Sequence, residues 1–138
     1  MPFELIGAPW TDPKKVLTEL SSFETPGVLF SEEEFTPREI PGTASEPKYE
    51  NKLCRGIRIT IADRDAIEPV KLGVEIIAAF KRAHPNETEL RQRRFDILTG
   101  SSSVRKKLEA NVHPNDICTM WRPELEKFCR LREKYFLY

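Results

Sequence analysis

The chain has 138 residues, which is the size of a single domain, and 39% of them are hydrophobic, enough to bury a core. Its 22 basic and 22 acidic side chains cancel to a formal net charge of zero, which leaves no electrostatic case for a nucleic-acid or anionic-membrane partner. No apolar run approaches the roughly 20 residues that cross a bilayer, so we expect no membrane span and one folded domain over residues 1–138.

The N-terminal segment predicts an extended stretch followed by a short helix. Residues 1–10, MPFELIGAPW, are apolar and extended in character. Thr11 or Asp12 can accept a hydrogen bond as the N-cap of a helix. Pro13 suits the first helical position because its missing N–H costs nothing there. An amphipathic helix ending near Ser22 is therefore expected.

The next segment predicts a second strand and then a long loop. The strand begins at Val28, and residues 35–37 extend it along a sheet edge, because a proline cannot donate to a central ladder. The acidic run at residues 32–34 is interpreted as a solvated turn. Residues 39–51 are rich in Pro, Gly, Ser and charge, and loops of this length are often functional or mobile.

The clearest element is a strand, turn and helix in the middle of the chain. Ile57, Ile59 and Ile61 alternate with other residues at strand spacing, and the polar run at residues 63–65 follows at once. A helix then begins near Pro69. Its apolar face is expected to comprise Val70, Leu72, Val74, Ile76, Ile77 and Phe80.

The C-terminal third predicts a short apolar turn and further helices. Residues 95–100 are interpreted as the turn, and the serines at 101–103 offer N-caps for a helix that carries Val104 and Leu108.

The last predicted helix begins at His113-Pro114. Pro123 lies inside its pattern and should kink or split it, because proline removes one backbone bond and clashes with the preceding turn. Residues 135–138 are expected to pack back on the core. The apolar stripe of this helix is expected to comprise Ile117, Trp121, Leu125, Phe128 and Leu131.

Interleaved helices and few strands indicate an α+β fold. We predict a small mixed β-sheet that several helices cover, mainly on one face.

The metal-binding residue types are too few and too scattered to predict a metal site. Cys54, Cys118 and Cys129 have no CxxC spacing, and their odd number argues against a full disulfide framework, although one disulfide stays open. His84 and His113 stand without paired ligands, so no zinc site and no cofactor are expected.

The turn at residues 63–65 carries charged groups with two interpretations each. Asp63 and Asp65 could be paired carboxylates, which a glycoside hydrolase needs about 5–10 Å apart, or they could cap the turn and the following helix. Arg64 could hold a substrate carboxylate with its planar fork, or form a structural ion pair. No nucleophile elbow, P-loop, Rossmann glycine pattern or HExxH motif is present, so no catalytic residue is assigned.

Two aromatic residues are candidates for sugar binding. Trp10 lies at a proline-ordered loop tip, where an indole face can stack on a sugar ring, although a core position is the commoner place for tryptophan. Tyr49, near the end of the long loop, has the same two interpretations.

The order of short motifs resembles the C-terminal domain of the exo-β-N-acetylmuramidase (NamZ-type) family. Residues 2–10, PFELIGAPW, resemble the opening of that domain. The further matches are, in chain order, Phe35-Thr36-Pro37, Lys48-Tyr49 ahead of Cys54-Arg55-Gly56, Asp63-Arg64-Asp65-Ala66, Phe95 to Gly100, Trp121 with Pro123-Glu124-Leu125 and Phe128, and Tyr135 to Tyr138. Together they span almost the whole chain.

The resemblance implies a part of a bacterial peptidoglycan hydrolase. Such enzymes release N-acetylmuramic acid from the non-reducing end of peptidoglycan fragments. A Rossmann-like N-terminal domain, which this chain does not resemble, carries their catalytic carboxylate, and the substrate cleft lies between that domain and the C-terminal one. Family members are often exported, and the sequence itself leaves the compartment open.

Our hypothesis from the sequence is that the domain forms one wall of the muramic-acid pocket and is inactive alone. Trp10, Tyr49, Asp63 and Arg64 would line the pocket, with Arg64 binding the lactyl carboxylate that distinguishes N-acetylmuramic acid from N-acetylglucosamine. The alternatives are a stand-alone, non-catalytic sugar-binding or protein-interaction module and a self-sufficient hydrolase that uses Asp63 and Asp65.

Overall fold

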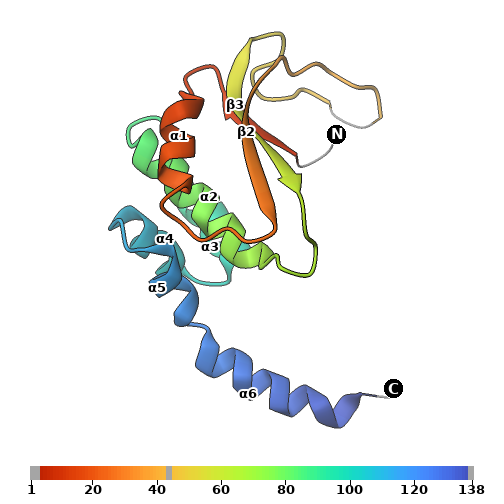
Figure 1. Ribbon diagram of the computed structural model, residues 1–138, viewed down its shortest axis with the longest axis vertical. Coiled ribbons are helices and arrows are strands. Elements are labelled where there is room, and N and C mark those ends of the chain that lie inside the picture. The colour runs from red at the N-terminus through yellow and green to blue at the C-terminus, as the bar shows by residue number, and fades with distance from the viewer. Residues whose placement is uncertain (1–3, 43–44, 137–138) are drawn as a thin grey trace. The chain divides into compact units, whose positions relative to one another are not determined.

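The computed structural model describes residues 4–42 and 45–136. Backbone contacts divide the chain into two compact units, Met1–Glu89 and Leu90–Tyr138. Strands belong to the first unit, while helices follow one another through the described part of the second (Figure 1). The predicted α+β class is confirmed. That residues 1–138 form one domain stays a prediction.

The first unit is built on a three-stranded antiparallel sheet in the order β1-β3-β2. Its strands are β1 (Leu5–Ala8), β2 (Val28–Phe35) and β3 (Cys54–Ile61). The prediction of a mixed sheet is wrong, because both strand pairs are antiparallel. A helix does cross from β1 to β2, as between parallel neighbours, but β3 occupies the place between them and pairs antiparallel with both.

The acidic run at residues 32–34 lies in β2, so its interpretation as a turn is wrong. Arg58 Nε on β3 donates to Glu33 Oε2 at 3.0 Å, and Arg58 Nη1 lies 3.6 Å from Glu4 Oε2. Arg55 Nε donates to Glu34 Oε1 at 3.0 Å. Opposite charges on neighbouring strands stabilise the pairing of those strands. The acidic run alone does not indicate a strand, because its basic partners lie on β3, more than 20 residues further along the chain.

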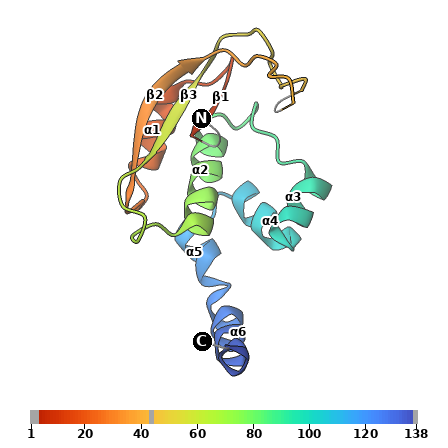
Figure 2. The same ribbon diagram turned by 90° about the vertical axis from the view of Figure 1, so that its right-hand side faces the viewer.

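Helix α1 (Pro13–Leu20) begins as its sequence predicts. Asp12 is the N-cap, and its Oδ1 accepts the backbone N–H of Lys14 at 3.1 Å. Val16 and Leu20 are buried. The helix contacts β2, β3 and helix α2, so it covers the sheet and packs against the second helix of this unit (Figure 2).

Helix α2 (Pro69–Ala83) completes the predicted strand, turn and helix. Ile57 is fully buried on the strand. Half of the expected helix face is buried, namely Val74, Ile76 and Phe80, while Leu72 and Ile77 are half-buried. Ile61 and Val70, however, are 56% and 67% exposed, against expectation. Both adjoin the solvent-exposed turn, where the strand and the helix extend beyond the packed part of the unit.

Glu75 is a buried acid on α2. Its side chain is almost fully inaccessible, and Lys71 Nζ lies 3.7 Å from its Oε1. That oxygen accepts no hydrogen bond from the residues that the structure describes. Burial raises the pKa of Glu75, and the nearby Lys71 ammonium offsets this only in part.

Replacing Glu75 with glutamine should stabilise the protein at neutral pH. A carboxyl whose pKa is higher in the folded than in the unfolded state destabilises the fold as pH rises through the window between the two values. Glu75→Gln should therefore raise the free energy of unfolding by about 1 kcal/mol at pH 7.5, with a smaller gain near pH 4. Thermal unfolding at both pH values measures this. Glu87→Gln, at an exposed position after the end of the same helix, is the control, and an equal gain at both pH values would contradict the assignment.

In the second unit, residues 95–100 form a helix end and not the predicted turn. Helix α3 (Gln92–Thr99) precedes helix α4 (Ser102–Glu109), and Gly100 between them has a φ of +72°. This left-handed conformation suits glycine after a helix C-terminus. Ser101 accepts the backbone N–H of Ser103 at 3.0 Å, so the predicted serine cap of α4 is confirmed.

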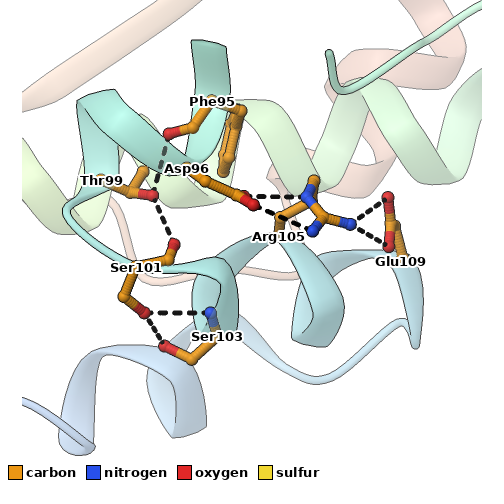
Figure 3. Close-up of polar contacts among 7 residues, drawn as sticks. All are labelled: Phe95, Asp96, Thr99, Ser101, Ser103, Arg105 and Glu109. Atoms are coloured by element: carbon orange, nitrogen blue, oxygen red, sulfur yellow. Dashed lines mark hydrogen bonds and ion pairs between the residues drawn. The ribbon is translucent and has the colours of Figure 1, made fainter. Parts of the chain in front are cut away.

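Arg105 joins α3 to α4 (Figure 3). Its Nε and Nη2 donate to the two carboxylate oxygens of Asp96 at 2.8 and 3.0 Å, and its Nη1 reaches Glu109 at 3.1 Å. The bonds from Arg105 lower the pKa of Asp96. The motif at residues 95–100 therefore has a structural role, because Asp96 anchors Arg105 and Gly100 ends the helix.

The last predicted helix is split near Pro123, as expected. Helix α5 (Pro114–Thr119) ends before helix α6 (Arg122–Arg132), and a 3-10 turn (Glu133–Tyr135) follows. The expected packing of the chain end is wrong for Tyr135 and Phe136, which are 75% and 60% exposed. Residues 137–138 lie outside the described residues. No residue of α6 is buried, so its apolar stripe finds no cover in the described chain.

Candidate functional site

Trp10 lies where three parts of the first unit meet. It follows β1, and its Nε1–H donates to Tyr49 Oη at 3.2 Å, 39 residues further along the chain. The imidazole of His84, at the C-terminal end of α2, meets the indole edge-on, with 5.3 Å between ring centroids. His84 Nε2 also accepts the backbone N–H of Asp12 at 3.0 Å. Trp10 is therefore held from two sides while its side chain stays half-buried.

Tyr49 reaches Trp10 from a backbone of unusual conformation. Glu46, Tyr49 and Asn51 have φ values of +49°, +63° and +56°, which residues other than glycine adopt rarely. Asn51 N–H donates to the carbonyl of Pro37 at 2.9 Å and fastens this segment. Such strain persists only where surrounding contacts hold it, and it concentrates at functional sites. The hydrogen bond from Trp10 lowers the pKa of the Tyr49 phenol.

Two open cavities share Trp10 as a wall. The larger, about 630 Å³, lies between the start of α1 and the acidic run at residues 32–34. The smaller, about 390 Å³, includes Tyr49 and Lys48 together with apolar residues of β1 and the side chain of Phe80. The Trp10 end of the sheet therefore combines half-buried aromatic side chains, charge and concave shape, which is typical of ligand sites.

Asp63 and Arg64 lie at the opposite end of β3. An eight-residue strand spans about 25 Å, so one sugar ring cannot touch both Trp10 and Arg64. Asp63 Oδ1 accepts the backbone N–H of Asp65 at 3.0 Å, which is the turn-capping role, although the N-cap of α2 is Glu68. Arg64 is exposed, and no described residue forms an ion pair with it.

The structure thus unites two of the four predicted site residues, Trp10 and Tyr49, and separates them from Asp63 and Arg64. The sequence did not assign a site role to His84 or Lys48. A histidine at a helix end gives no signal for a contact with a backbone 72 residues away. Lys48 directly precedes Tyr49 in the sequence motif, and this adjacency is the one signal that could have identified Lys48 as a site residue.

Neither a metal site nor a membrane span is found in the part of the chain that the structure describes. No three His, Cys, Asp or Glu side chains gather there in a way that could hold an ion. Within the same residues no helix combines the length and the apolar character needed to cross a bilayer.

Comparison with protein families shows the family of this chain. The family model described as "Exo-beta-N-acetylmuramidase NamZ, C-terminal" matches residues 1–138. The chain belongs to the NamZ C-terminal family. The resemblance seen in its motifs is thereby confirmed.

Two longer proteins each contain a region that is similar to this chain. It is 33% identical, over 138 residues, to the peptidoglycan β-N-acetylmuramidase NamZ of Bacillus subtilis strain 168, covering 99% of this chain and 32% of that protein. A crystal structure of a DUF1343 family protein from Bacteroides fragilis has the same fold, with a TM-score of 0.80 at 22% identity, over 99% of this chain and 35% of that one. The chain thus spans about a third of the length of each of these two proteins.

Proposed function

We propose that this chain acts as the auxiliary, substrate-cleft domain of an exo-acting peptidoglycan hexosaminidase that releases N-acetylmuramic acid. The family match over the whole chain carries the proposal. The 33% identical relative is named a peptidoglycan β-N-acetylmuramidase, and this chain corresponds to a third of it. A separate N-terminal domain, Rossmann-like in fold, would supply the catalytic carboxylate.

Within this function, Trp10 and Tyr49 would contact the glycan. Two cavities meet at Trp10, and its indole is fixed by Tyr49 and His84 at little further entropic cost on binding. A half-buried indole offers a flat apolar face to a sugar ring. Asp63 would then stabilise the turn, and Arg64 would not contact the terminal sugar.

The test is hydrolysis of a chromogenic β-N-acetylmuramide. This chain, the N-terminal domain of a relative, their mixture and a fusion of the two are assayed separately. We expect release of the chromophore from the mixture or the fusion and none from this chain alone, because the catalytic carboxylate would lie in the other domain. An Asp63→Asn, Asp65→Asn double variant of this chain should support the same activity.

Two results would contradict the proposal. Hydrolysis by the chain alone would place the catalytic carboxylates within these 138 residues. An inactive fusion, in which both domains are folded and the relative's own C-terminal domain restores activity, would favour a stand-alone sugar-binding module.

A further inference from the structure

The smaller cavity beside Trp10 has a distinctive lining. Residues of β1 with Phe35 and Phe80 make most of its wall apolar. Among the described residues that line it, Lys48 is the one that carries a charge. An apolar cavity with one cation is complementary to a small ligand with an apolar body and one negative charge.

Lys48 and Tyr49 can act on the same anion. Lys48 Nζ lies 4.8 Å from the centroid of the Tyr49 ring, so the ammonium and the phenol are neighbours. Tyr49 Oη accepts the Trp10 N–H, which leaves its own proton available, since no described residue accepts it. An ammonium and a hydroxyl therefore both have protons to donate at one side of the cavity.

We propose that this cavity is a carboxylate subsite, in which Lys48 and the Tyr49 hydroxyl bind the acid group of the sugar that stacks on Trp10. The inference rests on the proposed function, since the carboxylate in question is the lactyl group of N-acetylmuramic acid. It moves the acid-binding role from Arg64, at the far end of β3, to Lys48. The larger cavity suits this role less well, because its four acidic residues, Asp12 and the glutamates at 32–34, outnumber its two basic residues, Lys14 and Arg55.

Direct binding to this chain tests the subsite without any hydrolysis. The probes are N-acetylmuramic acid, N-acetylglucosamine, which lacks the lactyl group, and D-lactate, which lacks the sugar. Binding is followed by NMR through the indole N–H of Trp10, with the indole of Trp121, in the second unit, as an internal reference. We expect N-acetylmuramic acid to shift the Trp10 signal at a concentration about tenfold lower than either partial ligand requires.

Variants of Lys48 distinguish the contribution of its charge to ligand preference from that of the other cavity residues. Lys48→Gln should remove the roughly tenfold preference for N-acetylmuramic acid over N-acetylglucosamine, and Lys48→Arg should keep most of it. Lys52→Gln, on an exposed lysine of the same segment outside the cavity, is the matched control and should change nothing.

Three results would overturn the inference: a preference that survives in Lys48→Gln, ligand shifts around Arg64 in place of Trp10, or no shift with any probe. Hydrolysis by the two-domain fusion distinguishes the two proposals. If the fusion is active and Lys48→Gln keeps the preference, the subsite alone fails. If the fusion is inactive and the preference depends on Lys48, the proposed function fails and a carboxylate-binding module remains.

Discussion

Replacing Gly56 with alanine should destabilise the first unit by about 3 kcal/mol and lower its Tm by roughly 12–24 °C. Gly56 on β3 stands directly opposite Gly7 on β1. A Cβ added at Gly56 would overlap the carbonyl oxygen of Ile6 and lie 2.6 Å from the Cα of Gly7. These are backbone atoms that cannot rotate away, so β1 would have to separate from β3.

The reciprocal substitution and a helical glycine complete the experiment. Gly7→Ala should be similarly destabilising, because its Cβ would overlap the carbonyl oxygen of Arg55. Gly73, within α2, has no atom within 4 Å of an added Cβ, so Gly73→Ala should stabilise by about 0.5–1 kcal/mol through helix propensity. Thermal unfolding monitored by circular dichroism measures all three. A Gly56→Ala protein as stable as the parent would contradict the observed pairing of β1 with β3.

Replacing Trp10 with alanine should lower kcat/KM of the two-domain fusion on an N-acetylmuramide by roughly 10–150-fold, which is a loss of about 1.5–3 kcal/mol of transition-state stabilisation. The indole would present the surface on which the sugar stacks, and its loss also removes the partner of Tyr49 Oη. Trp10→Phe should be milder, since it keeps an aromatic face and loses only the N–H donor. The measurement is steady-state hydrolysis by the fusion that carries each variant.

Arg64→Ala is the control for position, and its kcat/KM should stay close to that of the parent. Arg64 lies beyond the reach of a sugar bound at Trp10, at the other end of β3. Thermal unfolding of each variant shows whether a loss of activity reflects a loss of fold. The reverse pattern, a strong loss with Arg64→Ala and none with Trp10→Ala, would place the glycan at the opposite end of the sheet.

Features encoded by neighbouring residues were predictable from the sequence. The Asp12 cap, the helix from Pro69 and the split near Pro123 depend on contacts within a few residues. Helix α3 was missed because none of its residues is buried, so hydrophobic periodicity gave no signal. An ion pair from Asp96 to Arg105, on the next helix, holds it.

The candidate site was predictable in its residue types and not in its geometry. Trp10 and Tyr49 were identified as aromatic candidates, but nothing local shows that a hydrogen bond joins them across 39 positions. The motif that contains Arg64 suggested the same pocket, whereas the direction of β3 carries it to the far end. Where a long strand separates two motifs, their order along the chain does not tell whether they share a ligand.

The central place of β3 also sets the order in which the protein can fold during synthesis. The edge strands β1 and β2 each pair with β3 and have no pairing with one another. Residues 5–8 therefore remain without their partner until residues 55–58 have been made, which takes several seconds at roughly 5–20 residues per second. Through that interval the N-terminal strand is an open edge that can pair with other chains. Its brevity, four residues, limits that hazard.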